Sequence, residues 1–578
     1  MRSPVISRRA DPDALIVAQH ARIARLEAAL WHGGFQPSRL GAYQAAWREL
    51  EALIAARGDD NRHAFVLVIP VADSPTQLRR CLASLLELCR LYGYGGMADG
   101  VFSKVSVMVA DDSADDALVA AHRAVIDAYT AQGLRIRHFG LAAQRALLDT
   151  LAGIDLAAIV GDASRARSGH KGQAMMRNLA YLALAHEADD GAPRLIYTLD
   201  ADQQFQVKVE SPPGNGGVYA VNYFAQLDAI FSMRDVDVLT GKVVGDPPVS
   251  PAVMAANFLD DVAAFLSEMA ASGPDAPYRS EGRAENDDAA YHDMAGLFGF
   301  DRPAGAYRYR CASLAHPDHA AAFADFARHL KSFFHGEHPT RITWYRHAPA
   351  LASVAPARTV YTGNYVFRPE ALRWFIPFAP LRLRMSGPTL GRLLKAELGP
   401  RFVAANLPML HARTVETGVA EFRPGVVTDG DAVDLADEFE RQFYGDVMLF
   451  SVERLTALGF PAAALPQAAL AAVFDAVHGD MRARYAERQR EVIAKLDDLT
   501  ARLAAPAWWQ ADGHAEAVDR YRAFFAGMAQ NFGRASRVHA RLADDADWQR
   551  WRSRMIAAVT AWPRDRDAWN TALARLAP

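Results

Sequence analysis

Short apolar runs alternate with helical patterns through the first half of the chain. The run 65–69 is apolar at every position, which is typical of a strand covered on both faces of a sheet. The predicted strands are residues 65–69, 105–109, 134–139 and 194–199, and the predicted helices begin at Pro75 and span about 115–131 and 171–187. Strands that alternate with helices predict an α/β fold with a doubly wound, mostly parallel sheet.

Helical patterns flank this region. Residues 12–57 predict helix, and the polar stretch 58–62 marks a boundary. Apolar residues recur at steps of three and four from Phe474 to Leu503, which predicts a long amphipathic helix paired with a second one around 521–532. This stripe favours core packing, with a partner-binding face as the alternative. We therefore expect an N-terminal helical segment at 1–62, an α/β domain at 63–428 and a helical accessory domain at 429–578.

The composition excludes several classes of protein. The 578 residues carry a formal net charge of −4, so no basic footprint for nucleic acid is expected. Three cysteines (Cys81, Cys89 and Cys311) give neither a disulfide framework nor metal-ligand spacing, as is typical of a reducing cytoplasm. The first residues lack the apolar core of a signal peptide, and no apolar run approaches the ~20 residues of a membrane span. We expect a soluble cytoplasmic protein, with peripheral attachment to the inner membrane left open.

Acidic residues follow three of the predicted strands. Asp73 comes shortly after the first strand, Asp111 and Asp112 follow the second, and Asp200 and Asp202 follow the strand 194–199. Ligands of a doubly wound sheet bind beyond the carboxyl ends of its strands, so these acids predict a site there. Two nearby carboxylates can bind Mg²⁺ together with substrate phosphates. An Asp-x-Asp pair alone is also explained by a solvated strand end.

The segment Ser168–Ala180 carries a second signal. Gly169 and Gly172 allow a close backbone approach at a helix start, where free amides favour an anion. Lys171 and Arg177 add cations that can contact phosphates. The spacing matches neither the P-loop nor the dinucleotide fingerprint. The alternative is a surface helix with a glycine-containing start.

Together these parts resemble the nucleotide-sugar glycosyltransferases of the GT-A fold, especially family 2, over about residues 65–415. The matching segments are Val68-Ile-Pro70, Asp111-Asp112-Ser113, the helix from Gly169 to Ala180, Leu199-Asp-Ala-Asp202, and Gly363-Asn364 with Phe367-Arg368 and Glu370. The resemblance implies transfer of a sugar from a nucleotide-diphosphate donor, with Mn²⁺ or Mg²⁺ as cofactor. The acceptor is an unknown small molecule, glycan or lipid-linked group. The C-terminal helices would serve acceptor choice or homo-oligomer formation.

The resemblance also assigns roles to individual residues. It places Pro70, Asp73, Asp111 and Asp112 at the nucleoside, Gly169, Lys171, Arg177 and Asp200 at the donor diphosphate, Asp200, Asp202 and His411 at the metal, and Asn364 and Arg368 at the acceptor. His411 follows a short apolar run late in the domain, where these enzymes often keep a metal-binding histidine. His335, His338 and His347 are expected to be exposed loop residues.

One feature of the family is missing. Inverting family 2 enzymes commonly carry a carboxylate about twenty residues after the Gly-Asn segment, but here Arg384 to Arg392 contains none. Either the general base lies elsewhere, with Asp246 and Glu370 as candidates, or the enzyme is retaining and uses no such base. Asp246 is equally explained as a turn residue before Pro247.

Two other functions stay open. A nucleotidyltransferase of related architecture also uses Mg²⁺ and acids, but it carries a Gly-rich basic loop after the first strand, where this chain has Pro70-Val-Ala-Asp-Ser-Pro75. A catalytically silent protein that binds a sugar nucleotide or acts as a scaffold would explain the missing carboxylate. The intact Asp-x-Asp and Arg-Asn motifs weigh against it.

Overall fold

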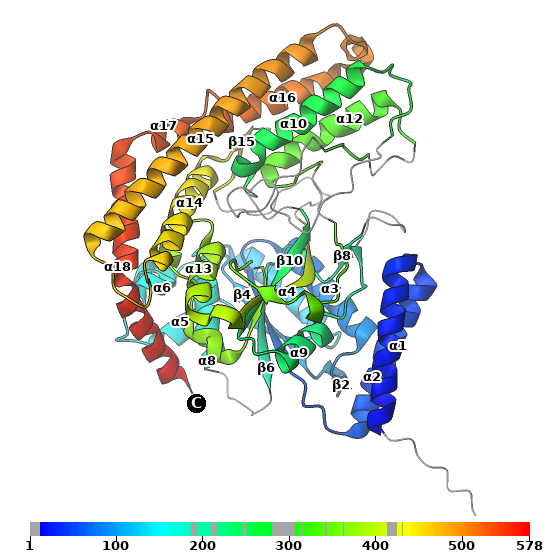
Figure 1. Ribbon diagram of the computed structural model, residues 1–578, viewed down its shortest axis with the longest axis vertical. Helices are drawn as coiled ribbons and strands as arrows, with labels where there is room; N and C mark the ends of the chain where they lie inside the picture. The colour runs from blue at the N-terminus through cyan, green and yellow to red at the C-terminus, as the bar shows by residue number, and fades with distance from the viewer. Residues whose placement is uncertain are drawn as a thin grey trace, which may run out of the picture.

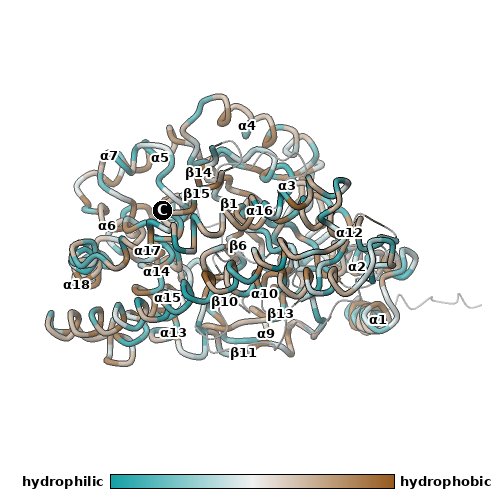
Figure 2. The backbone as a smooth tube through the Cα atoms, turned by 90° about the horizontal axis from the view of Figure 1, so that it is seen from above, coloured by the Kyte–Doolittle hydropathy of each residue, from teal (hydrophilic) through white to brown (hydrophobic). Residues whose placement is uncertain are grey.

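The computed structural model describes residues 12–186, 193–209, 217–246, 250–279, 307–311, 314, 316–340, 344–361, 363–412, 425–429 and 432–577. A sheet surrounded by helices forms one layer, and a group of long helices forms a second layer above it (Figure 1). The carboxyl-terminal helix α18 and the amino-terminal helix α1 lie at opposite sides of the molecule (Figures 1 and 2).

The central sheet has nine strands and is mostly parallel. From one edge to the other they are β11 (Ala355–Pro356), β13 (Phe402–His411), β10 (Val238–Gly245), β12 (Asn364–Phe367), β6 (Arg194–Leu199), β1 (Ala64–Val71), β4 (Val105–Asp111) and β5 (Arg135–Phe139), while β7 (Gln203–Gln204) pairs with β13. Strand β12 is antiparallel to both β6 and β10, so β5, β4, β1, β6, β10 and β13 all run in one direction. This arrangement confirms the predicted α/β class and doubly wound sheet.

Both faces of the sheet are covered, as the continuous apolar runs predicted. On β1, Phe65, Leu67 and Ile69 belong to one hydrophobic cluster, and Val66 and Val68 belong to another. The first cluster includes helices α1 (Pro12–Gly33), α2 (Pro37–Arg57), α3 (Pro75–Tyr92), α4 (Asp116–Thr130) and α9 (Tyr223–Met233). The second includes α5 (Leu141–Thr150), α6 (Ala157–Val160), α7 (Ala163–Ala166), α8 (Gln173–Ala185) and α13 (Ser386–Leu398). Because side chains alternate along a strand, each face receives every second residue.

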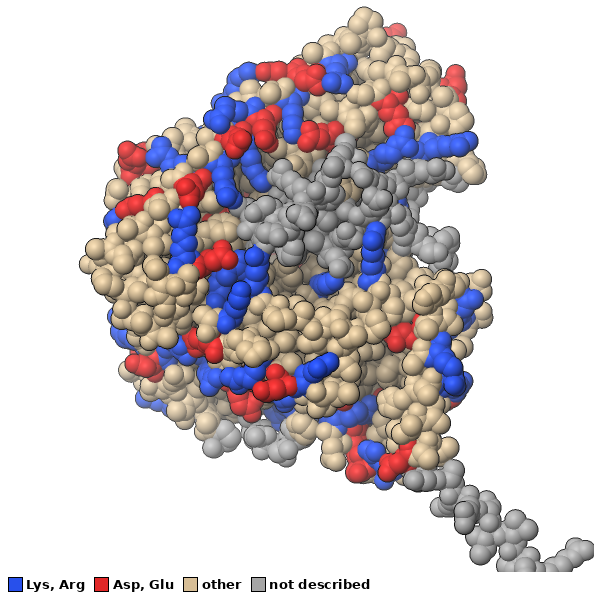
Figure 3. Space-filling view, viewed as in Figure 1, with Lys and Arg blue, Asp and Glu red and all other residues tan. Residues whose placement is uncertain are grey.

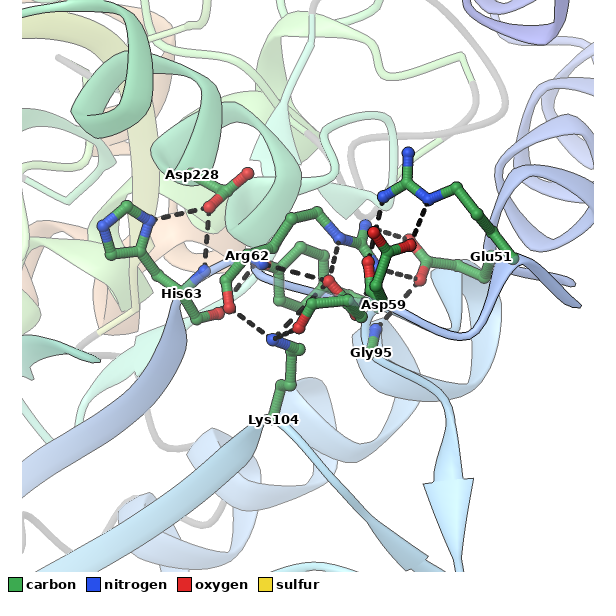
Figure 4. A network of polar contacts seen from close by, with 10 residues as sticks. Glu51, Asp59, Arg62, His63, Gly95, Lys104 and Asp228 are labelled. Atoms are coloured by element: carbon green, nitrogen blue, oxygen red, sulfur yellow. Dashed lines mark hydrogen bonds and ion pairs between the residues drawn. The ribbon is translucent and has the colours of Figure 1, made fainter. Parts of the chain in front are cut away.

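The amino-terminal helix prediction is confirmed in type but not in continuity. Gly34 adopts a left-handed conformation with φ 85, and Pro37 begins α2, so the chain turns between the two helices. A polar network then joins α2 to the start of β1 (Figure 4). Arg62 forms two hydrogen bonds to Glu51, at 2.6 and 2.8 Å, and the backbone N–H and Nδ1 of His63 both lie within 2.9 Å of Asp228 Oδ1.

The second layer combines helices from the middle and the end of the chain. Its members are α10 (Pro251–Ala270), α12 (His319–His329), α14 (Ala436–Ala457), α15 (Gln467–Ala504), α16 (Ala515–Phe532), α17 (Arg537–Leu542) and α18 (Asp545–Leu576). Helix α10 packs along α15 and α12 along α16 (Figure 1), and the Phe258 and Phe524 rings meet edge to face at 5.6 Å. Hydrophilic and hydrophobic residues alternate along α15 (Figure 2), so the predicted amphipathic helix is confirmed.

The division of the chain into three domains stays a prediction. The core of the helical layer is continuous with one face of the sheet. Helix α18 returns to the sheet layer, where Trp569 Nε1 donates a hydrogen bond of 2.7 Å to the Leu372 carbonyl. Within the described residues, no helix is long and apolar enough to cross a membrane.

One histidine departs from expectation. His338 is 1% exposed and its ring meets that of Phe258 at 4.9 Å, whereas the sequence predicted an exposed loop residue. His335 and His347 are partly exposed, and His347 stacks on Trp31 at 4.4 Å. The His338 ring packs against Phe258 of α10, which is distant in sequence, and against the nearby Phe333.

Between α14 and α15 a buried carboxyl group is held by hydrogen bonds. Asp446 is fully buried and accepts hydrogen bonds from Tyr485 Oη at 2.5 Å and Gln442 Nε2 at 2.7 Å. Burial raises the pKa of Asp446 to about 6, although these hydrogen bonds and the charges of Arg488 and Arg384 lower it. Compared with the unfolded chain, the folded protein therefore favours the protonated form of the Asp446 carboxyl group.

Asp446 predicts a change of stability with pH. Between its unfolded pKa, near 3.8, and its folded value, about 6, the folded chain binds more protons than the unfolded chain. This group's contribution to the free energy of unfolding should rise as pH falls from about 6 to about 4. Urea unfolding of wild type and Asp446→Asn at both pH values measures it, and an identical pH dependence in the two proteins would contradict the assignment.

Candidate functional site

Five of the parallel strands, β1, β4, β6, β10 and β13, end at one edge of the sheet. We call this the carboxyl edge. It holds the sequence-predicted residues Pro70, Asp73, Asp111, Asp112, Asp200, Asp202, Asp246 and His411, together with the start of α8. The ends of these parallel strands coincide, so residues far apart in sequence become neighbours.

Asp202 and His411 face each other across this edge. His411 Nδ1 lies 2.8 Å from the Asp246 carbonyl oxygen, and His411 Nε2 lies 3.1 Å from Asp202 Oδ2. A carbonyl oxygen can only accept, so Nδ1 carries the proton. Nε2 is then the ring nitrogen that faces the Asp202 carboxylate. The side chains are 3% and 27% exposed for His411 and Asp202, so the histidine is fixed and the carboxylate reaches solvent.

This pair fits a divalent cation that is shared with a substrate. Carboxylate oxygens and histidine ring nitrogens are both common metal ligands, and the backbone contact at Nδ1 orients the ring as second-shell groups do at metal sites. The described residues contain no group of three or more His, Cys, Asp or Glu side chains arranged to hold a metal. Mg²⁺ is commonly bound by one or two carboxylates plus substrate phosphates, so a site with few protein ligands suits a cation bound with a diphosphate.

Asp200 points to different partners. It forms an ion pair with Arg177, which is 2% exposed, and accepts a hydrogen bond of 3.2 Å from Gln173 Nε2. A β-carbon on Gly363 would lie 2.6 Å from Gln203 Nε2 and 2.7 Å from Asp200 Oδ2, so a larger residue there would displace these two side chains. The structure thus separates the two acids of the Asp-x-Asp motif: Asp202 faces His411 and Asp200 anchors Arg177.

Asp111 organises the loop after β4 from inside the protein. Its carboxylate contacts His122 Nδ1 at 3.1 Å and His138 Nε2 at 2.9 Å, and it accepts the Ser113 N–H at 3.0 Å. Burial alone would raise the pKa of Asp111, but these hydrogen bonds outweigh it and hold the pKa below its usual range. His122 Nε2 also accepts the Ser74 N–H at 3.2 Å, so the loops after β1 and β4 are joined through one ring.

Lys171 lies inside the protein and contacts a neighbouring acid. Its side chain is fully buried, with Nζ 2.9 Å from Asp112 Oδ1 and 2.6 Å from the Ser168 carbonyl oxygen. The Gly172 N–H donates to Asp112 Oδ2 at 2.8 Å, so Asp112 caps the start of α8. A β-carbon on Gly169 would lie 2.7 Å from the Ser113 carbonyl oxygen, which explains the glycine by close packing. The diphosphate contact assigned to Lys171 requires it to leave Asp112.

Two strained residues meet above this network. Asp73 and His170 adopt left-handed conformations with φ 50 and 55, and His170 Nε2 lies 2.6 Å from Asp73 Oδ2. Such conformations cost on the order of 1–3 kcal/mol each in a non-glycine residue and cluster at binding sites. The side chain of Asp73 is 12% exposed and that of His170 is 31% exposed, so the pair is mostly covered and His170 is its more accessible member.

Pro70 and Asn364 lie at the carboxyl edge but have internal roles. Pro70 is buried within β1, in register with Ala110 of β4. Asn364 is 2% exposed, and its Nδ2 donates to the carbonyl oxygens of Lys242 and Leu407 at 2.7 and 2.9 Å. Its Oδ1 accepts from the Tyr197 hydroxyl group, so Asn364 joins three strands of the sheet.

Two predicted residues lie at the opposite edge, which corrects the sequence-based placement. Strand β12 is antiparallel to β6, so its first residue lies at the carboxyl edge and the residues after it lie at the far end. Arg368 donates to the carbonyl oxygens of Val236 and Phe231, and Glu370 is exposed nearby. The structure therefore does not bring Arg368 or Glu370 to the proposed acceptor and catalytic positions.

The structure adds residues that the sequence did not indicate. Asn178, next to Arg177, donates to the Ile376 carbonyl oxygen at 3.1 Å and accepts the Ile376 N–H at 2.8 Å, which fixes the segment leading to Arg382. Arg382 lies beside the start of α8: its Nε would be 4.0 Å from a β-carbon placed on Gly172. The Arg-Asn motif includes Asn178 without indicating this contact, and no motif marks Arg382.

An aromatic residue with two cations lies on the Asp246 side. Lys208 and Arg310 lie over the Trp344 ring at 5.4 and 5.2 Å from its centre. Burial lowers the pKa of Lys208, while the nearby Asp246 carboxylate opposes this shift. Lys208 is more than a hundred positions away from Arg310 and Trp344 in the sequence, so no local sequence pattern indicates this contact.

Comparisons with known proteins leave the chain without a matching family. No protein-family model matches it, and no curated protein matches it. Solved structures similar to it include the mannosyltransferase PcManGT from Pyrobaculum calidifontis in complex with GDP-Man and Mn²⁺, at 10% identity over 96% of this chain and 100% of that chain, with a TM-score of 0.31.

Two further structures are similar at the same low level. TarS 1–349 from S. aureus is 14% identical over 81% of this chain and 91% of its own, with a TM-score of 0.26. Mouse xyloside xylosyltransferase 1, in its apo form, is 11% identical over 60% of this chain and 78% of its own, with a TM-score of 0.22. Likenesses this weak carry no argument, so the function proposed below rests on this chain's own residues.

Proposed function

We propose that the chain is a glycosyltransferase that moves a sugar from a nucleotide-diphosphate sugar to an acceptor and depends on Mn²⁺ or Mg²⁺. The observation that carries this proposal is the pair formed by Asp202 and His411, whose Oδ2 and Nε2 atoms lie 3.1 Å apart at the carboxyl edge of a doubly wound sheet. The same edge holds the start of α8 and an ordered set of acids. This combination suits a substrate that carries both a nucleoside and a diphosphate.

Different residues of the chain would bind the cation, the diphosphate and the nucleoside. Asp202 Oδ2 and His411 Nε2 would hold the cation, and Asp200 keeps Arg177 at the same edge through their ion pair. The bound cation would stabilise the negative charge that develops on the leaving diphosphate. Asp73, which is paired with His170 and joined through the Ser113 hydroxyl group to the loop after β4, would contact the ribose of the nucleoside.

Of the two candidates for a general base, Asp246 is the one at the carboxyl edge. Its backbone carbonyl orients His411, and its carboxylate interacts with the ammonium group of Lys208. An acid here could accept the proton of the acceptor hydroxyl group. We keep Asp246 in this role for an inverting reaction; a retaining reaction would need no such base.

Donor turnover tests the proposal. The purified protein is incubated with Mn²⁺ and UDP-, GDP- and dTDP-sugars, and both thermal stabilisation and nucleoside diphosphate release are measured. We expect one nucleotide family to stabilise the protein and to be cleaved only when a divalent cation is present. Pyrophosphate release from a nucleoside triphosphate would favour a nucleotidyltransferase, and binding without turnover would favour a silent sugar-nucleotide-binding protein.

A further inference from the structure

A strained loop beside the start of α8 carries the first observation. Phe378, Arg382 and Met385 have φ values of 55, 53 and 65, the left-handed region that such residues rarely adopt. The loop contains η5 (Ala379–Leu381) and leads into α13. Strain of this kind persists where surrounding contacts hold it and is frequent at ligand-binding segments.

Contacts from both layers fix this loop. Asn178 of α8 forms two hydrogen bonds with the backbone of Ile376, just before the loop, and Arg441 Nε of α14 donates to the Arg382 carbonyl oxygen at 2.5 Å. The Arg384 N–H donates to the Arg441 carbonyl oxygen at 3.2 Å. A β-carbon on Gly445 would lie 2.5 Å from the Arg384 carbonyl oxygen, so α14 packs directly on the loop backbone.

This packing gathers arginines where the helical layer meets the sheet. Arg382 is partly exposed beside Gly172, and none of the described carboxylates lies within ion-pair distance of it. Arg384 contacts the buried Glu438 at 3.0 Å and is 21% exposed at its side chain. Figure 3 shows Lys and Arg side chains gathered between the two layers on this face.

The electrostatics of the cluster favour an anion. Burial, followed by the nearby Arg384 charge, lowers the pKa of Arg441, while Asp437 and Glu438 oppose the shift. Keeping cations together and partly desolvated costs free energy, which a bound anion offsets. Guanidinium groups are suited to carboxylates and phosphates because they donate in a planar fork.

We propose that the loop from Phe378 to Met385, together with Arg441 of α14, binds a carboxylate or phosphate group of the sugar acceptor. This inference rests on the proposed function and names the acceptor as an anionic molecule. The cluster lies against the helical layer, whereas Asp202 and His411 lie at the ends of β6 and β13. Inverting family 2 enzymes commonly carry a carboxylate about twenty residues after the Gly-Asn segment. In this region the present chain has arginines instead.

Calorimetric titration tests the anion site without an identified acceptor. Inorganic phosphate and acetate are the probes, glycerol is the neutral control, and Mn²⁺ with saturating UDP or GDP fills the donor site. We expect saturable binding of phosphate, acetate or both, and none of glycerol. The anion that binds with the higher affinity indicates whether the acceptor carries a phosphate or a carboxylate group. Arg382→Gln should weaken this binding by about tenfold or more, as expected for a lost hydrogen bond to a charged group.

Two matched variants define the result. Arg401→Gln removes a guanidinium group that pairs with Asp237 at the opposite edge of the sheet, and it should leave anion binding unchanged. Arg382→Lys keeps the charge and should retain part of the affinity. Equal binding in wild type and Arg382→Gln, absence of saturable binding, or competition between the anion and the nucleotide would each overturn the inference.

The test is independent of the donor proposal. The same titration without nucleotide reports on Arg382 even if no nucleotide binds. Loss of anion binding beside intact donor turnover would contradict only the acceptor class. Intact anion binding beside absent donor turnover would contradict only the transferase.

Discussion

Replacing Asp202 with asparagine is expected to lower kcat/KM for the nucleotide sugar by on the order of 10²–10³-fold, the loss typical of one group that stabilises developing charge. The amide keeps the size of the side chain but removes the negative charge that pairs with His411 and the proposed cation. Steady-state release of nucleoside diphosphate, measured over a range of Mn²⁺ concentrations, provides the test.

A matched aspartate controls for general effects of the substitution. Asp237 pairs with Arg401 at the start of β10, at the opposite edge of the sheet. Asp237→Asn should keep near-wild-type turnover. Equal activity of the Asp202→Asn and Asp237→Asn proteins would remove Asp202 from the proposed site.

Replacing Lys171 with methionine is expected to reduce the free energy of unfolding by roughly 3–5 kcal/mol, the cost of removing one partner of a buried ion pair. The ammonium group is fully buried, and its loss leaves the Asp112 carboxylate without its cation. Urea unfolding followed by circular dichroism measures the change. Adding Asp112→Asn to Lys171→Met should recover part of the loss, because no uncompensated charge remains.

An exposed ion pair serves as the control for Lys171. Arg454 and Asp480 lie 2.6 Å apart on the surface of the helical layer, with side chains 49% and 53% exposed. Arg454→Met should change the free energy of unfolding by less than about 1 kcal/mol. If Lys171→Met is as stable as wild type and instead loses nucleotide affinity, Lys171 contacts the diphosphate as the sequence predicted.

The sheet could be predicted because its main strands correspond to local hydrophobic patterns in the sequence. Short apolar runs identified β1, β4 and β6, and the acids after them marked the carboxyl edge. The resemblance to GT-A enzymes, and not a local pattern, put Asp202 and His411 in one predicted site; their side chains lie 3.1 Å apart. The strands themselves could be found because periodicity is a local property of the sequence.

Other placements depend on topology and packing that no local pattern carries. Arg368 and Glu370 lie at the wrong edge because β12 is antiparallel, and its four residues give no sign of direction. Lys171 lies inside because the glycine loop folds onto Ser113, a contact made by a distant segment. The Arg382 cluster forms only where α14 packs on the loop before α13, so the sequence could not indicate it.

The most direct test of the central claim is pulsed electron paramagnetic resonance of Mn²⁺ bound with a nucleoside diphosphate. The geometry predicts that Mn²⁺ binds tightly only when the nucleotide is present, and that the ion shows coupling to a nitrogen nucleus from His411 Nε2. The coupling should disappear in His411→Gln. Nucleotide-dependent Mn²⁺ without nitrogen coupling in the wild-type protein, or the same coupling in His411→Gln, would contradict a metal site formed by Asp202 and His411.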